Sequence, residues 1–97
     1  MRLAARVDEN QKEIIKAFRK LGCSVLPLHQ IGKGCPDLLV TKGSVKAVLV
    51  EIKNGAKPAS ARALTPDQEK FHASWLGSIF VVKDLGDVLA LVKGLER

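Results

Sequence analysis

The chain has 97 residues, 46% of them hydrophobic, and its 16 Lys and Arg against 10 Asp and Glu give a net charge of +6. This length predicts one domain over residues 1–97, and the apolar fraction argues against disorder. No secretory signal and no membrane-spanning run is evident, and two isolated cysteines suit a reducing compartment, so we expect a cytoplasmic protein. The basic charge favours an anionic partner such as nucleic acid or an anionic membrane surface, although many basic domains are only soluble.

The first expected element is a helix that begins near Asp8, where Asp8 and Gln11 fit a capping box. Gly22 is expected to end it. Apolar residues recur at helical spacing and predict one buried face: Ile14, Ile15, Phe18 and Leu21. Glu13 lies next to this stripe.

Three β-like segments follow. Residues 23–29 predict a weak strand, and Pro27 suggests a sheet edge or a bulge. Residues 37–41 and 45–53 predict two strong strands, and the short turn between them implies an antiparallel pair. Residues 47–50 have the continuous apolar character of a strand buried on both faces.

The second half predicts a mobile basic loop over residues 54–63 and a helix that Thr65 caps. A buried strand over residues 79–82 and an amphipathic helix over residues 87–95 complete the chain. The middle helix is expected to carry three large side chains inward: Phe71, Trp75 and Leu76. The order αβββαβα predicts an α/β fold with a small mixed sheet, because the strand–helix–strand segment implies a parallel crossover.

A carboxylate and an ammonium lie at the end of the second strong strand. Glu51 and Lys53 are two residues apart, so their side chains leave the same face, while Ile52 points into the core. Taken alone, they suggest a surface ion pair. Asp37 begins the neighbouring strand, however, and the short turn brings it beside Glu51. Two carboxylates this close repel each other unless a cation or a proton lies between them, and open oxygen sites suit Mg²⁺ or Mn²⁺.

Three segments in this order resemble the PD-(D/E)xK nuclease superfamily: Gly34-Cys35-Pro36-Asp37, Glu51-Ile52-Lys53 and Leu64-Thr65-Pro66-Asp67-Gln68. More narrowly, the chain is similar to the VRR-NUC (virus-type replication-repair nuclease) family in its short, phage-like, stand-alone form. The similarity extends over residues 8–82 and includes the opening helix. It implies a restriction-endonuclease-like fold, a small mixed sheet flanked by helices.

The resemblance also implies a metal site. Asp37 and Glu51 correspond to the metal-binding carboxylates, and the backbone carbonyl of Ile52 is implied as a further ligand for Mg²⁺ or Mn²⁺. Glu13 is similar to the helix glutamate that completes the acidic shell, directly or through water.

Other residues have implied roles towards DNA. Lys53 resembles the lysine that contacts the scissile phosphate and the attacking water, and Gln68 the glutamine that steadies this lysine or a phosphate. Basic loop residues are expected to contact DNA phosphates: Lys33, Lys57 and Arg62. The family further implies a homodimer that cuts branched DNA, such as four-way junctions, to leave a 5′-phosphate.

Some interpretations remain open. His72 lies one helical turn after Gln68, so it either borders the site or is a packed or surface histidine, while Trp75 is most simply a core residue. A dimer contact is expected on the helix 87–95 or near Val25. The rival functions are a non-catalytic basic nucleic-acid-binding module, with structural acids, and a nuclease subunit that requires a partner chain.

Overall fold

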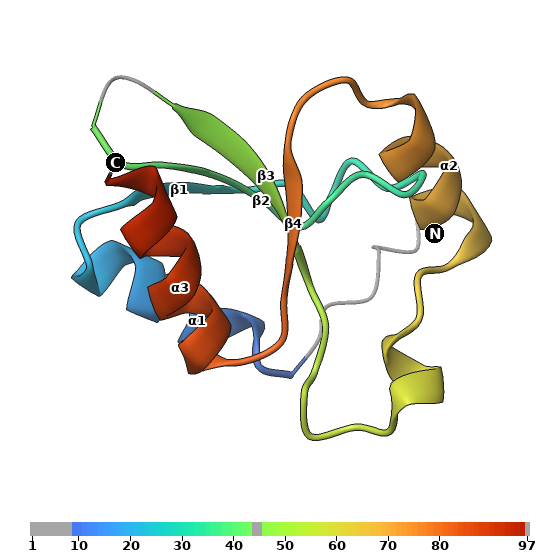
Figure 1. Cartoon of the computed structure of the whole chain (residues 1–97). Helices are drawn as coiled ribbons and strands as arrows, with labels where there is room; N and C mark the ends of the chain where they lie inside the picture. The colour runs from blue at the N-terminus through green and yellow to red at the C-terminus, as the bar shows by residue number, and fades with distance from the viewer. Residues whose placement is uncertain (1–8, 44–45, 97) are drawn as a thin grey trace.

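The computed structural model describes residues 9–43 and 46–96, which form a mixed four-stranded sheet with helices on both sides (Figure 1). The spatial strand order is that of the sequence: β1 (Ser24–Pro27), β2 (Leu38–Thr41), β3 (Ala47–Ile52) and β4 (Ile79–Val82). β2 pairs antiparallel with β1 and β3, whereas β3 and β4 are parallel. The helices are α1 (Gln11–Lys20), α2 (Pro66–Ser74) and α3 (Leu85–Leu95), and a short 3-10 helix, η1 (Ala59–Arg62), lies in the basic loop. The predicted αβββαβα order and mixed sheet are confirmed.

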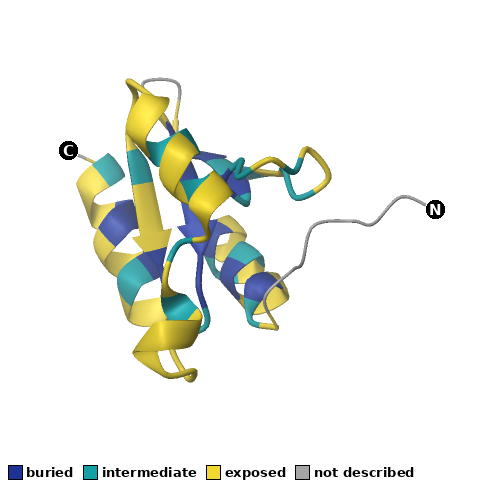
Figure 2. Ribbon diagram, turned by 90° about the vertical axis from the view of Figure 1, so that its right-hand side faces the viewer, coloured by how far each residue is buried: buried dark blue, intermediate teal, exposed yellow. Residues whose placement is uncertain are grey.

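The hydrophobic core lies on one face of the sheet, beneath α1 and α3, which run side by side in Figure 1. Figure 2 shows the same asymmetry, since the buried residues gather in the strands and on the inner sides of these two helices. Fully burying an apolar side chain contributes roughly 1.5–3 kcal/mol, so this face supplies most of the stability. Alternate strand positions and the helix stripes provide the fully buried members of the core: Ile14, Phe18, Leu38, Val40, Val50, Ile52, Val82 and Val88.

The first helix begins later than predicted. Asn10 occupies its N-cap position without a side-chain cap bond, and Asp8, the predicted cap, lies outside the described residues. The Asn10 amide is used elsewhere, because Nδ2 donates to the carbonyl oxygens of Lys53 (3.2 Å) and Lys83 (3.1 Å). These bonds attach the start of α1 to the residues that follow β3 and β4. The apolar stripe is confirmed, with Ile14 and Phe18 buried.

The predicted inward face of the middle helix is wrong. No residue of α2 is buried; Trp75 is 47% exposed, Leu76 is fully exposed, and Phe71 stacks on Trp75 with ring centroids 5.4 Å apart. α2 lies on the face of the sheet opposite the core (Figure 1), and its side chains reach Glu51 and Lys53 through polar contacts. An apolar pattern cannot reveal that a helix docks through polar groups.

The last strand also differs from its prediction as a buried strand. Phe80 and Val81 are 40% and 44% exposed, and only Val82 is buried. Among the strands of residues 9–43 and 46–96, β4 pairs with β3 alone and forms an edge of the sheet, as β1 does at the other end. The predicted edge position of the weak first strand is therefore confirmed. β4, in contrast, is more exposed to solvent than its apolar sequence suggested. None of the described helices is long and apolar enough to cross a membrane.

The last helix starts at Leu85, two residues before the predicted start, because two aspartates cap it. Asp84 Oδ1 accepts a hydrogen bond from Asp87 N (2.9 Å), and Asp87 Oδ2 accepts from Lys83 N (2.9 Å) and Lys83 Nζ (3.0 Å). Two hydrogen bonds from Lys83 lower the pKa of Asp87 from its ordinary value of 3.8. The bond from the backbone N–H has the largest effect, and the bond from the side-chain ammonium has the second largest.

This cap makes stability depend on acid pH. A carboxyl group with a lowered folded-state pKa stabilises the fold above its unfolded-state value and loses that effect as the pH falls through the lowered value. Asp87→Asn should therefore reduce the free energy of unfolding at pH 7, and the difference from wild type should shrink below pH 3.8. Urea unfolding of both proteins from pH 7 to pH 2.5 measures this difference. An equal loss at every pH would show that the Asp87 charge is not involved.

Candidate active site

Two carboxylates meet where β2 begins and β3 ends. The antiparallel register pairs Leu38 with Val50, so Asp37 and Glu51 occupy the next opposing positions. Asp37 Oδ2 accepts a hydrogen bond from Ile52 N at 2.6 Å, which holds this carboxylate against the backbone of β3. The pairing expected from the short turn is therefore present.

The burial of Glu51 and Lys53 excludes the interpretation of a surface ion pair. Their relative exposures are 1% and 7%, and Ile52 between them is fully buried in the core. Glu51 and Lys53 consequently face the α2 side of the sheet. Buried charges are costly unless hydrogen bonds or opposite charges compensate for the lost water.

Gln68 on α2 supplies that compensation to both residues. Its Oε1 accepts from Lys53 Nζ at 2.8 Å and from Thr65 N at 2.9 Å, and its Nε2 donates to Glu51 Oε2 at 3.2 Å. Thr65 Oγ1 in turn accepts from Gln68 N, which completes a capping box at the start of α2. Because Oε1 faces two donors, Nε2 must face the carboxylate, so the helix cap also determines the orientation of the amide.

A second residue of α2, His72, reaches the same carboxylate. His72 Nε2 lies 3.4 Å from Glu51 Oε1, and the imidazole is 19% exposed. Burial, and then the positive charge of Lys53, lower the pKa of His72 from its ordinary value of 6.5. Of the two interpretations of His72, the position at the border of the site is the one that the structure supports.

Cys35 lies close to the acids on the loop before β2. Burial raises the pKa of its thiol, and the negative charges of Glu51 and Asp37 raise it further. The negative electrostatic potential of the two carboxylates thus extends over the loop. Because the pKa of Cys35 is raised, its side chain stays a thiol rather than a reactive thiolate at neutral pH.

The position of α2 depends on a close backbone contact at Gly34. This glycine has φ +79°, and a Cβ atom there would overlap the backbone carbonyl of Asp67 in the first turn of α2. Gly32 in the same loop also has a positive φ, of +71°, but has open space where a Cβ would stand. The close contact is therefore specific to Gly34 and is with α2.

Gly34→Ala should therefore be much more damaging than Gly32→Ala. Each variant carries the cost of a left-handed backbone, about 1–2 kcal/mol, and Gly34→Ala must in addition displace α2. We expect Gly34→Ala to lose more unfolding free energy and to lower any activity that depends on Gln68. Thermal unfolding of the matched pair measures the difference, and equal destabilisation would show that the Asp67 contact is unimportant.

Glu13 lies in the first turn of α1. It is exposed and lines a small hollow with Asn54, Gly55 and Lys83 on the α1 side. Within residues 9–43 and 46–96, no group of three or more His, Cys, Asp or Glu side chains is arranged to hold a metal ion. A completed acidic shell that includes Glu13 stays a prediction without support from this geometry.

The predicted DNA-contacting residues lie in loops on the surface. Lys33 and Lys57 are exposed and Arg62 is half-buried in η1, where its Nε has no hydrogen-bond partner. Lys33 adopts a positive φ of 54°, which is unusual for a residue with a side chain. Their contacts with DNA stay predictions.

Comparisons with known proteins bear on the fold that carries these residues. No family model and no curated protein matches the chain. Among solved structures, one titled "VRR_NUC domain" matches with a TM-score of 0.64 and 28% sequence identity, over 86% of this chain and 89% of that chain. The fold, with two carboxylates and a lysine at the ends of paired strands, is that of a small nuclease domain. The chain is thus similar in structure to a VRR_NUC domain, the family that its sequence motifs resemble.

Proposed function

We propose that this domain is a Mg²⁺- or Mn²⁺-dependent DNA endonuclease that hydrolyses phosphodiester bonds at Asp37, Glu51 and Lys53. The observation that carries the proposal is the burial of Glu51 and Lys53, 1% and 7% exposed, beside Asp37, with one glutamine bonded to both. A domain gains no stability from placing a carboxylate and a lysine here in preference to apolar side chains. A requirement for their chemistry accounts for their presence.

The donor set suits a hard divalent cation. Asp37 and Glu51 offer carboxylate oxygens, and the Ile52 carbonyl points to the same side of β3 as its N–H, which meets Asp37. Mg²⁺ and Mn²⁺ prefer oxygen ligands, and Mg²⁺ usually retains several waters beside one or two carboxylates, so no third protein acid is needed. A bound ion would lower the pKa of a water molecule and neutralise phosphate charge.

The Lys53 ammonium is preorganised to contact a phosphate. Gln68 Oε1 fixes its ammonium at 2.8 Å, so the positive charge needs no reorganisation when negative charge develops on the scissile group. The loop residues Lys33, Lys57 and Arg62 are proposed to contact phosphates farther along the DNA, which would orient the duplex without reading its sequence.

We further propose that the substrate is branched DNA such as a four-way junction, in keeping with the VRR-NUC resemblance. The rival interpretation, a non-catalytic nucleic-acid-binding module, is less favoured because buried carboxylates facing a phosphate weaken binding unless a cation lies between them. A nuclease subunit that requires a partner chain would have the same site but no activity alone.

Cleavage assays with the purified chain test the proposal. Linear duplex, flap, single-stranded and four-way-junction DNA are incubated with Mg²⁺, Mn²⁺ or EDTA, and we expect metal-dependent cleavage with 5′-phosphate products, fastest on the junction. Mn²⁺ binding is measured in parallel. Failure to bind Mn²⁺ and to cut any substrate would favour the binding module, whereas Mn²⁺ binding without cleavage would favour a subunit that needs a partner.

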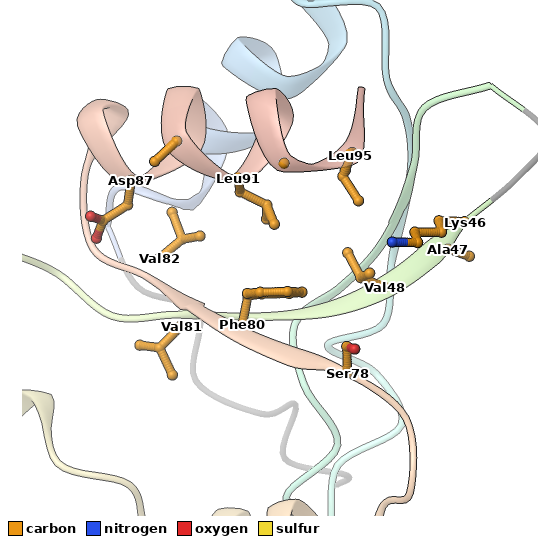
Figure 3. Close-up of a pocket in the computed structure, with 12 residues that line it drawn as sticks. Lys46, Ala47, Val48, Ser78, Phe80, Val81, Val82, Asp87, Leu91 and Leu95 are labelled. Carbon is orange, nitrogen blue, oxygen red and sulfur yellow. The ribbon is translucent and has the colours of Figure 1, made fainter. Parts of the chain in front are cut away.

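We also propose a homodimer, because symmetric incision of a junction needs two sites related by a two-fold axis. Two surfaces remain candidates. On α3, Leu89 is 50% exposed beside Ala17 and Leu21. A separate apolar hollow of about 500 Å³ lies between α3 and β4, where Figure 3 shows Phe80 and Leu91. On β1, the last strand at the other end of the described sheet, Leu26 is 55% exposed.

Charge substitutions distinguish these surfaces. We expect a dimer of about twice the 10.5 kDa chain mass. Of the two single variants Leu89→Glu and Leu26→Glu, we expect only the one on the true interface to convert the dimer to monomers. Sedimentation equilibrium at micromolar concentration measures the mass. A wild-type protein that is monomeric with and without junction DNA would rule out the dimer but not the chemistry of a single site.

A further inference from the structure

We propose that His72 is a positioning residue, whose imidazole holds the Glu51 carboxylate in the orientation that a divalent cation requires. This inference rests on the proposed metal-dependent function and concerns a residue outside the acid–acid–lysine set. His72 is not proposed as a ligand of the metal or as a group that reacts with DNA.

The first support is the division of the Glu51 oxygens between two residues of one helix. Gln68 Nε2 donates to Oε2 at 3.2 Å, and His72 Nε2 lies 3.4 Å from Oε1. Gln68 and His72 are four residues apart and therefore project from the same face of α2. Each carboxylate oxygen thus has one α2 partner, and together they restrict rotation of the carboxylate about its last bond.

The second support is the direction of the hydrogen bond. An ionised carboxylate only accepts, so the contact is favourable when His72 Nε2 carries the proton and donates. The 3.4 Å separation is long for an N–H···O bond, which indicates a supporting contact rather than a strong one. A carboxylate has lone pairs for a metal ion in addition to these donors, so the contact with His72 does not compete with a cation.

The third support is the absence of an ordinary packing role. α2 has no buried residue, and its aromatic residue Phe71 stacks on the exposed Trp75 rather than entering the core. His72 is nevertheless turned towards the sheet and is only 19% exposed. The side chain is therefore directed at Glu51 from a helix that places no residue in the core.

Hydrogen bonds to metal-binding carboxylates commonly change metal affinity by about 10- to 100-fold when they are removed. His72→Phe keeps a ring of similar size but loses the donor, and we expect Mn²⁺ affinity to fall by about tenfold, at the low end because the contact is long. His72→Gln retains a donating amide and should recover most of the affinity. Titration of the DNA-free protein with Mn²⁺ alone, followed by electron paramagnetic resonance, gives these affinities.

Two readouts separate positioning from a general structural effect. Excess Mn²⁺ should restore DNA cleavage by His72→Phe towards the wild-type rate, whereas loss of folding would not respond to metal. The melting temperature should change little, because α2 has no buried residue to disturb. His29→Phe, the same change at the other histidine of the chain, is the matched control and should leave Mn²⁺ affinity unchanged.

The outcomes distinguish the inference from the function on which it rests. If the wild type binds Mn²⁺ and His72→Phe binds it equally tightly, the positioning role is wrong and the nuclease proposal stands. If the Phe and Gln variants lose affinity equally, the donor is irrelevant and the role is again wrong. If the wild type itself does not bind Mn²⁺, the proposed metal site fails and this inference fails with it.

Discussion

Glu51→Gln is expected to abolish DNA cleavage in Mg²⁺, with a loss of roughly three orders of magnitude or more, since metal stabilisation of a transition state contributes several kcal/mol. The substitution keeps the volume of a side chain that is 1% exposed and removes its charge, so the effect on folding should be small by comparison. DNA binding in EDTA should be unchanged or tighter, because one negative charge near the phosphates is removed. Single-turnover cleavage and binding titrations measure the two effects.

The controls for this prediction come from both carboxylates and from α2. Asp37→Asn should have a similar effect, because an asparagine oxygen can still accept the hydrogen bond from Ile52 N while the charge is lost. Glu69→Gln makes the same acid-to-amide change at an exposed residue of α2 and should leave cleavage unaffected. Near wild-type cleavage by Glu51→Gln or Asp37→Asn would show that the metal site is assigned wrongly.

Lys53→Met should lower the rate of cleavage by about two orders of magnitude or more, as expected when a preorganised charge is removed from a transition state. Methionine fills similar space in a position that is 7% exposed, and the loss of the ammonium leaves Gln68 Oε1 with its bond from Thr65 N. Mn²⁺ affinity should change much less than the rate, because Lys53 is not a ligand.

Measurements at saturating metal decide this prediction. Single-turnover rates at high Mn²⁺ isolate the chemical step from binding of the ion, and Lys16→Met on the exposed side of α1 is the matched control. A variant that loses Mn²⁺ affinity but cuts normally at saturating metal would make Lys53 a structural residue of the metal site.

The fold and the central pair of acids could be predicted from the sequence because both depend on local rules. Side chains alternate along a strand, and the short connection makes β2 and β3 antiparallel, which places Asp37 opposite Glu51. The core stripe of α1 and the αβββαβα order likewise follow from periodicity and turn residues. The motifs then pointed to the VRR-NUC family, which the solved VRR_NUC structure supports.

Contacts between distant segments could not be predicted in the same way. The apolar residues near the end of α2 suggested an inward face, but α2 docks through Gln68, His72 and a backbone contact at Gly34. Polar docking has no periodic signature in a sequence, because a single hydrogen bond depends on where another segment lies. For the same reason, no pattern reveals that Glu13 is exposed beside Asn54 and Lys83.

The sequence by itself therefore determined which residues form each strand and which two carboxylates oppose each other, because strand alternation and short turns act within a few residues. Only the tertiary structure decided that Glu51 and Lys53 are buried, and that their partners are one glutamine and one histidine from a helix more than ten residues later. Burial is the joint result of every segment that packs around a site. The electrostatic character of this site is accordingly a property of the assembled sheet and α2, not of the β3 strand that carries its residues.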